Sequence, residues 1–117
     1  MTDRAQVPHP LPEPLVELIA QRFRVIGEPM RIRILDALRE RSMTINELTE
    51  ALGATQQNVS KHVGVLAQAG IVARERDGNR VRCSIADDTI FELCELVCGG
   101  LRRQASDLGA LLYGDAA

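Results

Sequence analysis

Three cysteines are the residues of this chain whose type and spacing could bind a metal ion. Cys94 and Cys98 are four residues apart, so on a helix both thiols would lie on one face and could chelate one ion. Thiolates select soft ions such as As(III), Sb(III), Cd(II), Zn(II) or Hg(II). Cys83 is expected to point inward with Val81 and Ile85, and could supply a third sulfur. Three sulfurs without a histidine favour a trigonal thiophilic centre, with As(III) or Sb(III) as the first choice.

The same cysteines have two other interpretations. Cysteine often behaves as a small buried hydrophobe, and Cys94 falls on the apolar stripe of its predicted helix. A redox or persulfide switch is the second alternative. A direct bond between Cys94 and Cys98 is disfavoured, because Cβ atoms one helical turn apart are separated by ~5–6 Å. A disulfide allows only ~3.5–4.5 Å between Cβ atoms.

A second set of residues could read DNA. In the predicted helix after Thr55, polar side chains fill the first two turns, while Val59 and Val63 turn inward. Gln and Asn can both donate and accept toward adenine, and Ser and Lys suit phosphates or guanine. The predicted contact residues on this helix are Thr55, Gln56, Gln57, Asn58, Ser60, Lys61 and His62.

Arginines recur at alternate positions in a predicted β-hairpin. Strands are expected at 71–76 and 80–85, around the turn Asp77-Gly78-Asn79. Guanidinium groups on such a wing could lie along a phosphate backbone or in the adjacent minor groove. The candidate contacts are Arg74, Arg76, Arg80 and Arg82.

Five helices are needed to position these groups. Apolar spacing predicts a helix over about 14–26. Glu28-Pro29 opens a second helix. This second helix should leave Arg31 toward solvent and bury Ile32, Ile34, Leu35 and Leu38. Capping signals and glycines then bound helices over about 44–52, 55–69 and 89–112. The expected class is mainly α with a small β-hairpin, a winged helix-turn-helix of about five helices and a two-stranded wing.

Composition sets further limits. The 117 residues suit one domain, expected over 13–114 after a flexible Pro-rich arm at 1–12. The net charge is −2, but residues 55–82 hold five basic and two acidic side chains, a local balance of +3. Only 3% of the residues are aromatic, so the protein offers few side chains on which the bases of a single-stranded nucleic acid could stack. Double-stranded DNA is therefore the expected partner.

Other protein classes are disfavoured. No apolar run approaches the ~20 residues of a membrane span and no signal peptide is recognised, so we expect a cytoplasmic protein with reduced thiols and no membrane partner. The chain has no Gly-rich phosphate loop, no C-x2-C and no His or acid pair plausibly flanking a cysteine. We therefore predict that it is not an enzyme, a thiol redox catalyst included.

The chain resembles the ArsR/SmtB family of winged-helix repressors over about residues 15–110. The likeness lies in 23–35, in the helix pair at 44–69 and in 78–82. It implies a homodimer that pairs through the first and last helices, binds an inverted-repeat DNA operator and is usually released by an effector. The wide apolar surface of the last helix, which includes Leu96, Val97 and Leu101, independently favours a dimer.

Two common effector sites of that family are missing from this sequence. The thiolate site of the third helix needs Glu-Leu-Cys-x-Cys, whereas residues 47–51 read Glu-Leu-Thr-Glu-Ala. The zinc site of the last helix needs histidines, and that helix has none. A sensor, if present, would therefore use Cys94 and Cys98, with or without Cys83. A repressor with a redox or persulfide switch or with no metal effector, and a winged helix that binds only proteins, remain the alternatives.

Overall fold

The computed structural model describes residues 7–113, with side chains through residue 106. Residues 1–6 of the expected arm and Gly114 lie outside the described residues, as do the side chains of Leu108, Leu111 and Leu112. The chain divides into two compact units, Met1–Ala86 and Asp87–Ala117. No helix in the described range combines the length and apolar character needed to cross a membrane.

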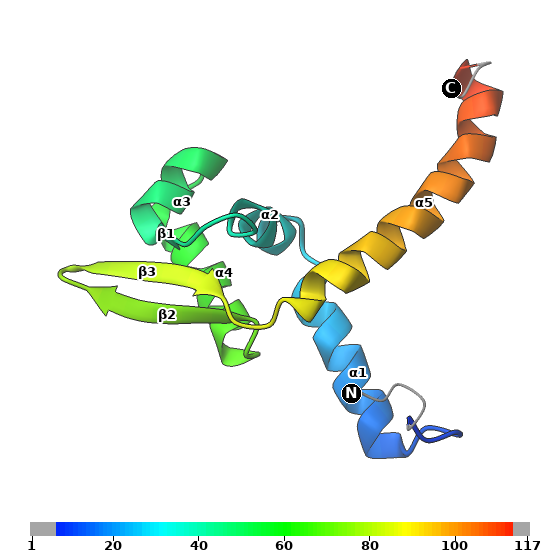
Figure 1. Ribbon diagram of the computed structural model, residues 1–117, viewed down its shortest axis with the longest axis horizontal. Coiled ribbons are helices and arrows are strands. Elements are labelled where there is room, and N and C mark those ends of the chain that lie inside the picture. The colour runs from blue at the N-terminus through cyan, green and yellow to red at the C-terminus, as the bar shows by residue number, and fades with distance from the viewer. Residues whose placement is uncertain (1–6, 114–117) are drawn as a thin grey trace. The chain divides into compact units, whose positions relative to one another are not determined.

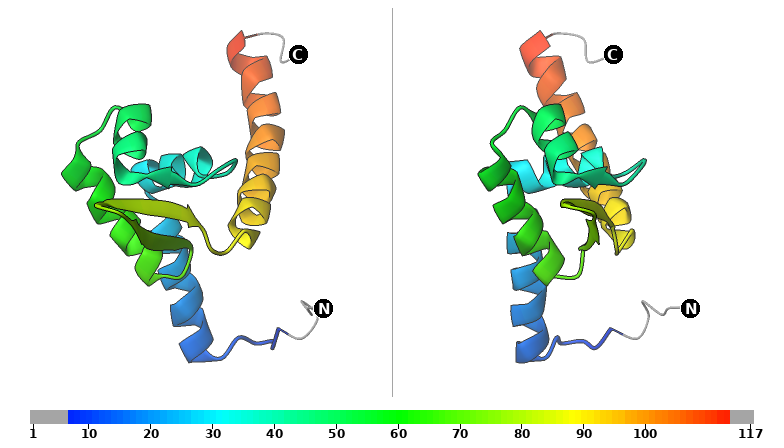
Figure 2. Two further views of the ribbon diagram at one scale, coloured as in Figure 1. Left: turned by 60° about the vertical axis from the view of Figure 1, so that its left-hand side comes forward. Right: turned by 90° about the vertical axis from the view of Figure 1, so that its left-hand side faces the viewer.

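The unit Met1–Ala86 has the predicted order of helices followed by a hairpin. Figure 1 shows the hairpin of β2 and β3 extending from the helices to a free turn. Helix α4 packs on α2, α3 and β2, and it lies beside the hairpin in both views of Figure 2. The elements are α1 (Glu13–Ile26), α2 (Pro29–Ala37), β1 (Met43–Thr44), α3 (Ile45–Leu52), α4 (Gln56–Gln68), β2 (Val72–Asp77) and β3 (Arg80–Ile85).

Local capping signals fix the helix-turn-helix formed by α3 and α4. The Thr44 hydroxyl accepts from the Glu47 backbone N–H at 3.1 Å, and the Glu47 carboxylate accepts from the Thr44 N–H at 2.9 Å. Gly53 ends α3 in the left-handed region, at φ 62°, where a side chain would be strained. The Thr55 hydroxyl then accepts from the Asn58 N–H at 3.1 Å. The capping box and both caps confirm the prediction.

The sheet has three strands in the order β1-β3-β2, so the predicted two-stranded wing was incomplete. Met43 pairs with Cys83, and Thr44 pairs with Arg82. An N-cap residue takes an extended backbone, and Thr44 has φ −76° and ψ 164°. The extended segment Met43–Thr44, which ends in the N-cap of α3, therefore also pairs with the edge of β3. A strand of two residues is too short to give a periodic signal in the sequence.

The core of this unit is aliphatic, as the shortage of aromatic residues required. One expectation for α2 was wrong: Ile32 is 46% exposed, whereas Arg31 is half-buried. At about 100° per residue, position 31 lies at the centre of the stripe formed by the buried Ile34, Leu35 and Leu38, whereas position 32 lies roughly 110° away from that centre. Fully buried apolar side chains of this core include Ile34, Leu48, Val59, Val63, Leu66, Ile71 and Cys83.

The unit Asp87–Ala117 is described as a single helix, α5 (Thr89–Tyr113), close to its predicted extent. Three of its apolar side chains are exposed within the chain: Leu96 is 74%, Leu101 58% and Val97 51% exposed. Helix α1 also carries exposed apolar side chains, with Leu18 at 67% and Phe23 at 54%. Two helices from opposite ends of the chain therefore present apolar surface that the chain itself leaves uncovered.

Candidate nucleic-acid interface

Four polar side chains form the exposed face of the N-terminal turns of α4, and we call them the reading face. Val59 and Val63 on the same helix are fully buried, so the helix packs with its polar side outward as expected. Of the other predicted contacts, Asn58 is half-buried, and the exposed Thr55 uses its hydroxyl oxygen as the N-cap. The reading face consists of Gln56, Gln57, Ser60 and Lys61.

His62 does not belong to this face, which corrects the sequence-based expectation. It is only 6% exposed, and its Nδ1 lies 3.1 Å from Nη1 of Arg31 on α2. The helical period places position 62 between the buried positions 59 and 66. The polar Ser60 and Lys61 directly before His62 concealed this inward orientation.

The four wing arginines lie on two faces of the hairpin. Side chains of directly opposite residues share a face, and Arg74 is opposite Cys83. Arg80 is opposite Asp77, because the turn contains only two residues. Arg74 and Arg76 therefore share the face of Cys83, whereas Arg80 and Arg82 share the other. The four arginines are thus divided between the two sides of the wing.

Arg82 is held by neighbouring groups of the protein. Its Nε donates to the Asp77 carboxylate at 3.2 Å, and its Nη1 donates to the Ser42 hydroxyl at 3.3 Å. The residue is half-buried, in contrast to the exposed Arg74, Arg76 and Arg80. Its guanidinium connects the wing to the segment before β1, so its local role is structural. The other three arginines remain accessible to a polyanion.

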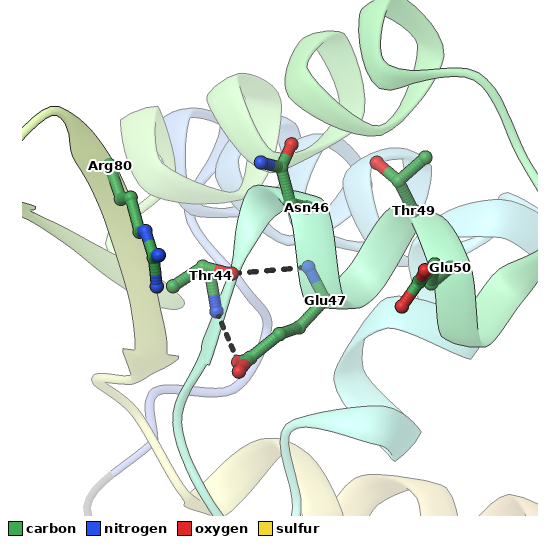
Figure 3. Close-up of a pocket in the computed structure, with 6 residues that line it drawn as sticks. All are labelled: Thr44, Asn46, Glu47, Thr49, Glu50 and Arg80. Carbon is green, nitrogen blue, oxygen red and sulfur yellow. Dashed lines mark hydrogen bonds between the residues drawn. The ribbon is translucent and has the colours of Figure 1, made fainter.

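A polar pocket connects the wing with α3 (Figure 3). Arg80 reaches it from β3, and Asn46, Thr49 and Glu50 face it from α3. An adjoining groove adds Gln56 and Ser60 of the reading face, together with Asn79 of the turn. The hydrogen bond from the Thr44 backbone N–H lowers the pKa of Glu47, which keeps this carboxylate charged in its capping role. No sequence pattern pointed to Asn46, since only the folded chain brings α3 beside the wing tip.

Gly64 is a second residue that the sequence analysis did not single out. The helical period places it on the side of α4 that carries Gln57, Ser60 and Lys61. A Cβ atom at this position would lie 3.7 Å from Nη1 of Arg74, an ordinary contact distance. The Arg74 guanidinium therefore lies against α4, so this wing arginine and the reading face form one continuous surface.

The cysteines fall into two different environments. Cys83 is fully buried on β3, and this burial raises the pKa of its thiol, which opposes the thiolate form that binds metals. Cys94 is half-buried and Cys98 is exposed, both on α5. Among the described residues, no group of three or more His, Cys, Asp or Glu side chains is arranged to hold a metal ion. The structure therefore distinguishes the Cys94–Cys98 pair from a core cysteine.

Comparison with known proteins agrees with the helix-turn-helix and the wing. Residues 26–75 match a family described as a helix-turn-helix domain. The chain is 43% identical over 101 residues to Rv0081, an uncharacterized HTH-type transcriptional regulator of Mycobacterium tuberculosis, and the match covers 86% of this chain and 89% of the relative. The crystal structure of Rv0081 aligns with a TM-score of 0.74 at 42% identity, covering 82% of this chain and 97% of the other.

Two other relatives carry more specific names. The HTH-type transcriptional repressor SmtB of M. tuberculosis is 36% identical over 80 residues, covering 68% of this chain and 59% of the relative. A probable mercury resistance operon repressor of Streptomyces lividans is 32% identical over 77 residues, covering 66% of this chain and 62% of the relative. The chain belongs to the ArsR/SmtB family of winged helix-turn-helix transcriptional repressors.

Proposed function

We propose that this repressor binds an inverted-repeat operator as a homodimer, with the reading face of α4 in the major groove and the wing along the backbone. The observation that carries the proposal is the exposed polar surface formed by α4 and the wing arginines on the folded chain. In a helix-turn-helix, the N-terminal turns of the second helix contact base edges while neighbouring elements contact phosphates. Gln56, Gln57, Ser60 and Lys61 suit the first task, and Arg74, Arg76 and Arg80 suit the second.

The exposed apolar side chains of α1 and α5 support the homodimer. Leu96 and Leu101 on α5, and Leu18 and Phe23 on α1, are all more than half exposed. Large apolar surfaces are costly in water and commonly mark interaction sites. A twofold dimer would cover the same surfaces on both copies and would present two reading faces to two half-sites.

Replacing Arg80 by Gln tests the phosphate contact. We expect weaker binding to all DNA sequences and a slope of log affinity against log salt that is smaller by about one, because one phosphate contact is lost. The measurement is a fluorescence-anisotropy titration across a range of salt concentrations. Arg33→Gln is the charge-matched control, since Arg33 is exposed on α2, outside the reading face and the wing.

A slope in the Arg80 variant that equals the parent slope would remove Arg80 from the set of phosphate contacts. A parent protein that retards no double-stranded DNA near ~0.1 M salt, where exposed charges still interact over about 10 Å, would contradict the DNA-binding proposal. That outcome would favour the interpretation as a protein-interaction domain.

We also propose that a thiophilic ion bound by Cys94 and Cys98 releases the operator. The two thiols lie one helical turn apart on α5, and Cys98 is exposed to incoming ions. Such a pair suits As(III), Sb(III), Cd(II) or Hg(II), and one relative is named for mercury resistance. The pair supplies two ligands, so further ligands would come from a second copy or from solvent. Cys83 is left out because its burial opposes ionisation.

The double substitution Cys94→Ser and Cys98→Ser tests this site. Arsenite or Cd(II) should release the operator from the reduced parent with a rise in thiolate-to-metal absorbance, and both responses should be lost in the variant. Cys83→Ala is the matched control and should keep both responses. Release that persists in the double variant would eliminate the Cys94–Cys98 pair as the sensor. Release by an oxidant or persulfide, with none by either ion, would support the redox alternative instead.

A further inference from the structure

A partly buried polar junction connects α1, α2 and α4 behind the reading face. The Nε of Arg31 donates to the Val25 carbonyl at 2.6 Å, and its Nη2 donates to the Arg24 carbonyl at 3.4 Å. These carbonyls belong to the C-terminal turn of α1, whose last carbonyls have no partner within the helix. The remaining nitrogen, Nη1, lies 3.1 Å from Nδ1 of His62 on α4. One guanidinium therefore joins the end of α1 to the side of α4.

The chemistry of arginine sets the direction of its hydrogen bond to His62. Arginine only donates, so Nδ1 of His62 must accept, and the neutral imidazole then carries its proton on Nε2. The Glu28 carboxylate accepts from the Arg31 backbone N–H at 3.0 Å and lies 3.9 Å from Nδ1 of His62. That backbone hydrogen bond is the main cause of the lowered pKa of Glu28. The charged carboxylate fixes the start of α2 beside the ring.

A second connection joins α1 to the other end of α4. Nη1 of Arg22 on α1 donates to the carbonyl of Ala69, the C-cap of α4, at 3.3 Å. This bond lies at the surface, whereas His62 is only 6% exposed. Helix α4 is thus hydrogen-bonded to α1 directly near its C-terminus and through Arg31 near its middle.

We infer that Arg31 and His62 are positioning residues that set the rotation of α4, and with it the direction of the reading face. The inference rests on the proposed function of that face. The other contacts of α4 with the core are aliphatic, through Val59, Val63 and Leu66, and apolar contacts have little directional preference. A hydrogen bond is directional, so the His62 bond restrains the rotation that those contacts allow. Ser60 and Lys61 directly precede His62, so their direction follows the rotation of the helix that the His62 bond restrains.

A comparison of His62→Leu with His62→Asn tests this role. Leucine fills the space but removes the acceptor, while asparagine can place an acceptor near the position of Nδ1. We expect His62→Leu to reduce the ratio of operator affinity to random-DNA affinity by roughly tenfold, the effect of about one mismatched base pair. The salt slope should stay at the parent value, because no phosphate contact changes. His62→Asn should recover most of the ratio.

Thermal unfolding and Arg31→Lys complete the experiment. If His62→Leu does not fold, Arg31→Lys removes the guanidinium geometry from the other side and should lower the same ratio. An unchanged ratio in a folded His62→Leu or Arg31→Lys variant would overturn the inference, as would equal losses on operator and random DNA. Failure of the proposed function is distinguishable, because the parent itself would then show no preference for any selected operator.

Discussion

A Leu101→Glu variant should be monomeric and should bind its operator at least about a hundredfold more weakly than the parent. Leu101 is 58% exposed on α5, near the still more exposed Leu96. In a dimer that covers this surface, a carboxylate at position 101 would lose its hydration without a partner. A monomer also loses the second half-site, and linked binding to two sites commonly contributes a factor of 10²–10⁴ in affinity. Sedimentation would measure the oligomeric state, and anisotropy would compare full and half operators.

Arg103→Gln is the matched control for this prediction. It changes the net charge by the same amount, and the helical period places it about opposite Leu101 on α5. It should remain dimeric and bind the operator nearly as the parent does. A dimeric Leu101→Glu variant with parental affinity would exclude this face of α5 from the interface. Binding of both proteins to a half-operator should be similar, because the reading face is unchanged.

The features that the sequence predicted well are those determined by neighbours along the chain. The capping box of Thr44 and Glu47 requires two side chains three residues apart, and the structure confirms both hydrogen bonds. The end of α3 at Gly53 and the hairpin turn at Gly78 likewise depend on local backbone preferences. Helix boundaries and the winged helix-turn-helix class could therefore be inferred before any tertiary contact was known.

Pairing across the chain explains what the sequence did not show. The third strand exists because the extended Thr44 meets β3, a contact between residues almost 40 positions apart. The division of the wing arginines depends on a two-residue turn, because one more residue would change which side chains share a face. His62 was misplaced for a related reason. A histidine that directly follows the polar Ser60 and Lys61 resembles a surface residue until Arg31 is seen to approach it.

The candidate site shows the same distinction between residue type and residue position. Residue types alone identified Gln56, Gln57, Ser60 and Lys61, because their polarity contrasts with the buried stripe of α4. They could not identify Asn46, which joins the site only through the pocket beneath Arg80. They also could not separate Cys83 from the other cysteines, because burial of a thiol depends on tertiary packing. Position in the fold therefore decides which of several suitable side chains can reach DNA or an ion.

The largest stability loss is expected from Leu48→Ala in the middle of α3. Leu48 is fully buried, and α3 contacts α2, α4 and β3. Removal of a buried leucine side chain leaves a cavity and typically costs about 2.7–5.0 kcal/mol. Domains of this kind are stable by only about 5–15 kcal/mol, so the variant would lose a large part of its free energy of unfolding. Urea denaturation at a fixed protein concentration measures the loss, because the stability of the proposed dimer would depend on concentration.

Leu52→Ala, one turn further along α3, is the matched control. Leu52 is half-buried, so the same atoms are removed from a position where water can fill the space left. It should cost about 1 kcal/mol, the usual size for a partly exposed site. Similar losses for the two variants would mean that α3 is not anchored through Leu48. The folded fraction of Leu48→Ala should keep the parental slope of log DNA affinity against log salt. The reason is that α3 supports the reading face from behind, so the substitution leaves the proposed phosphate contacts of the wing unchanged.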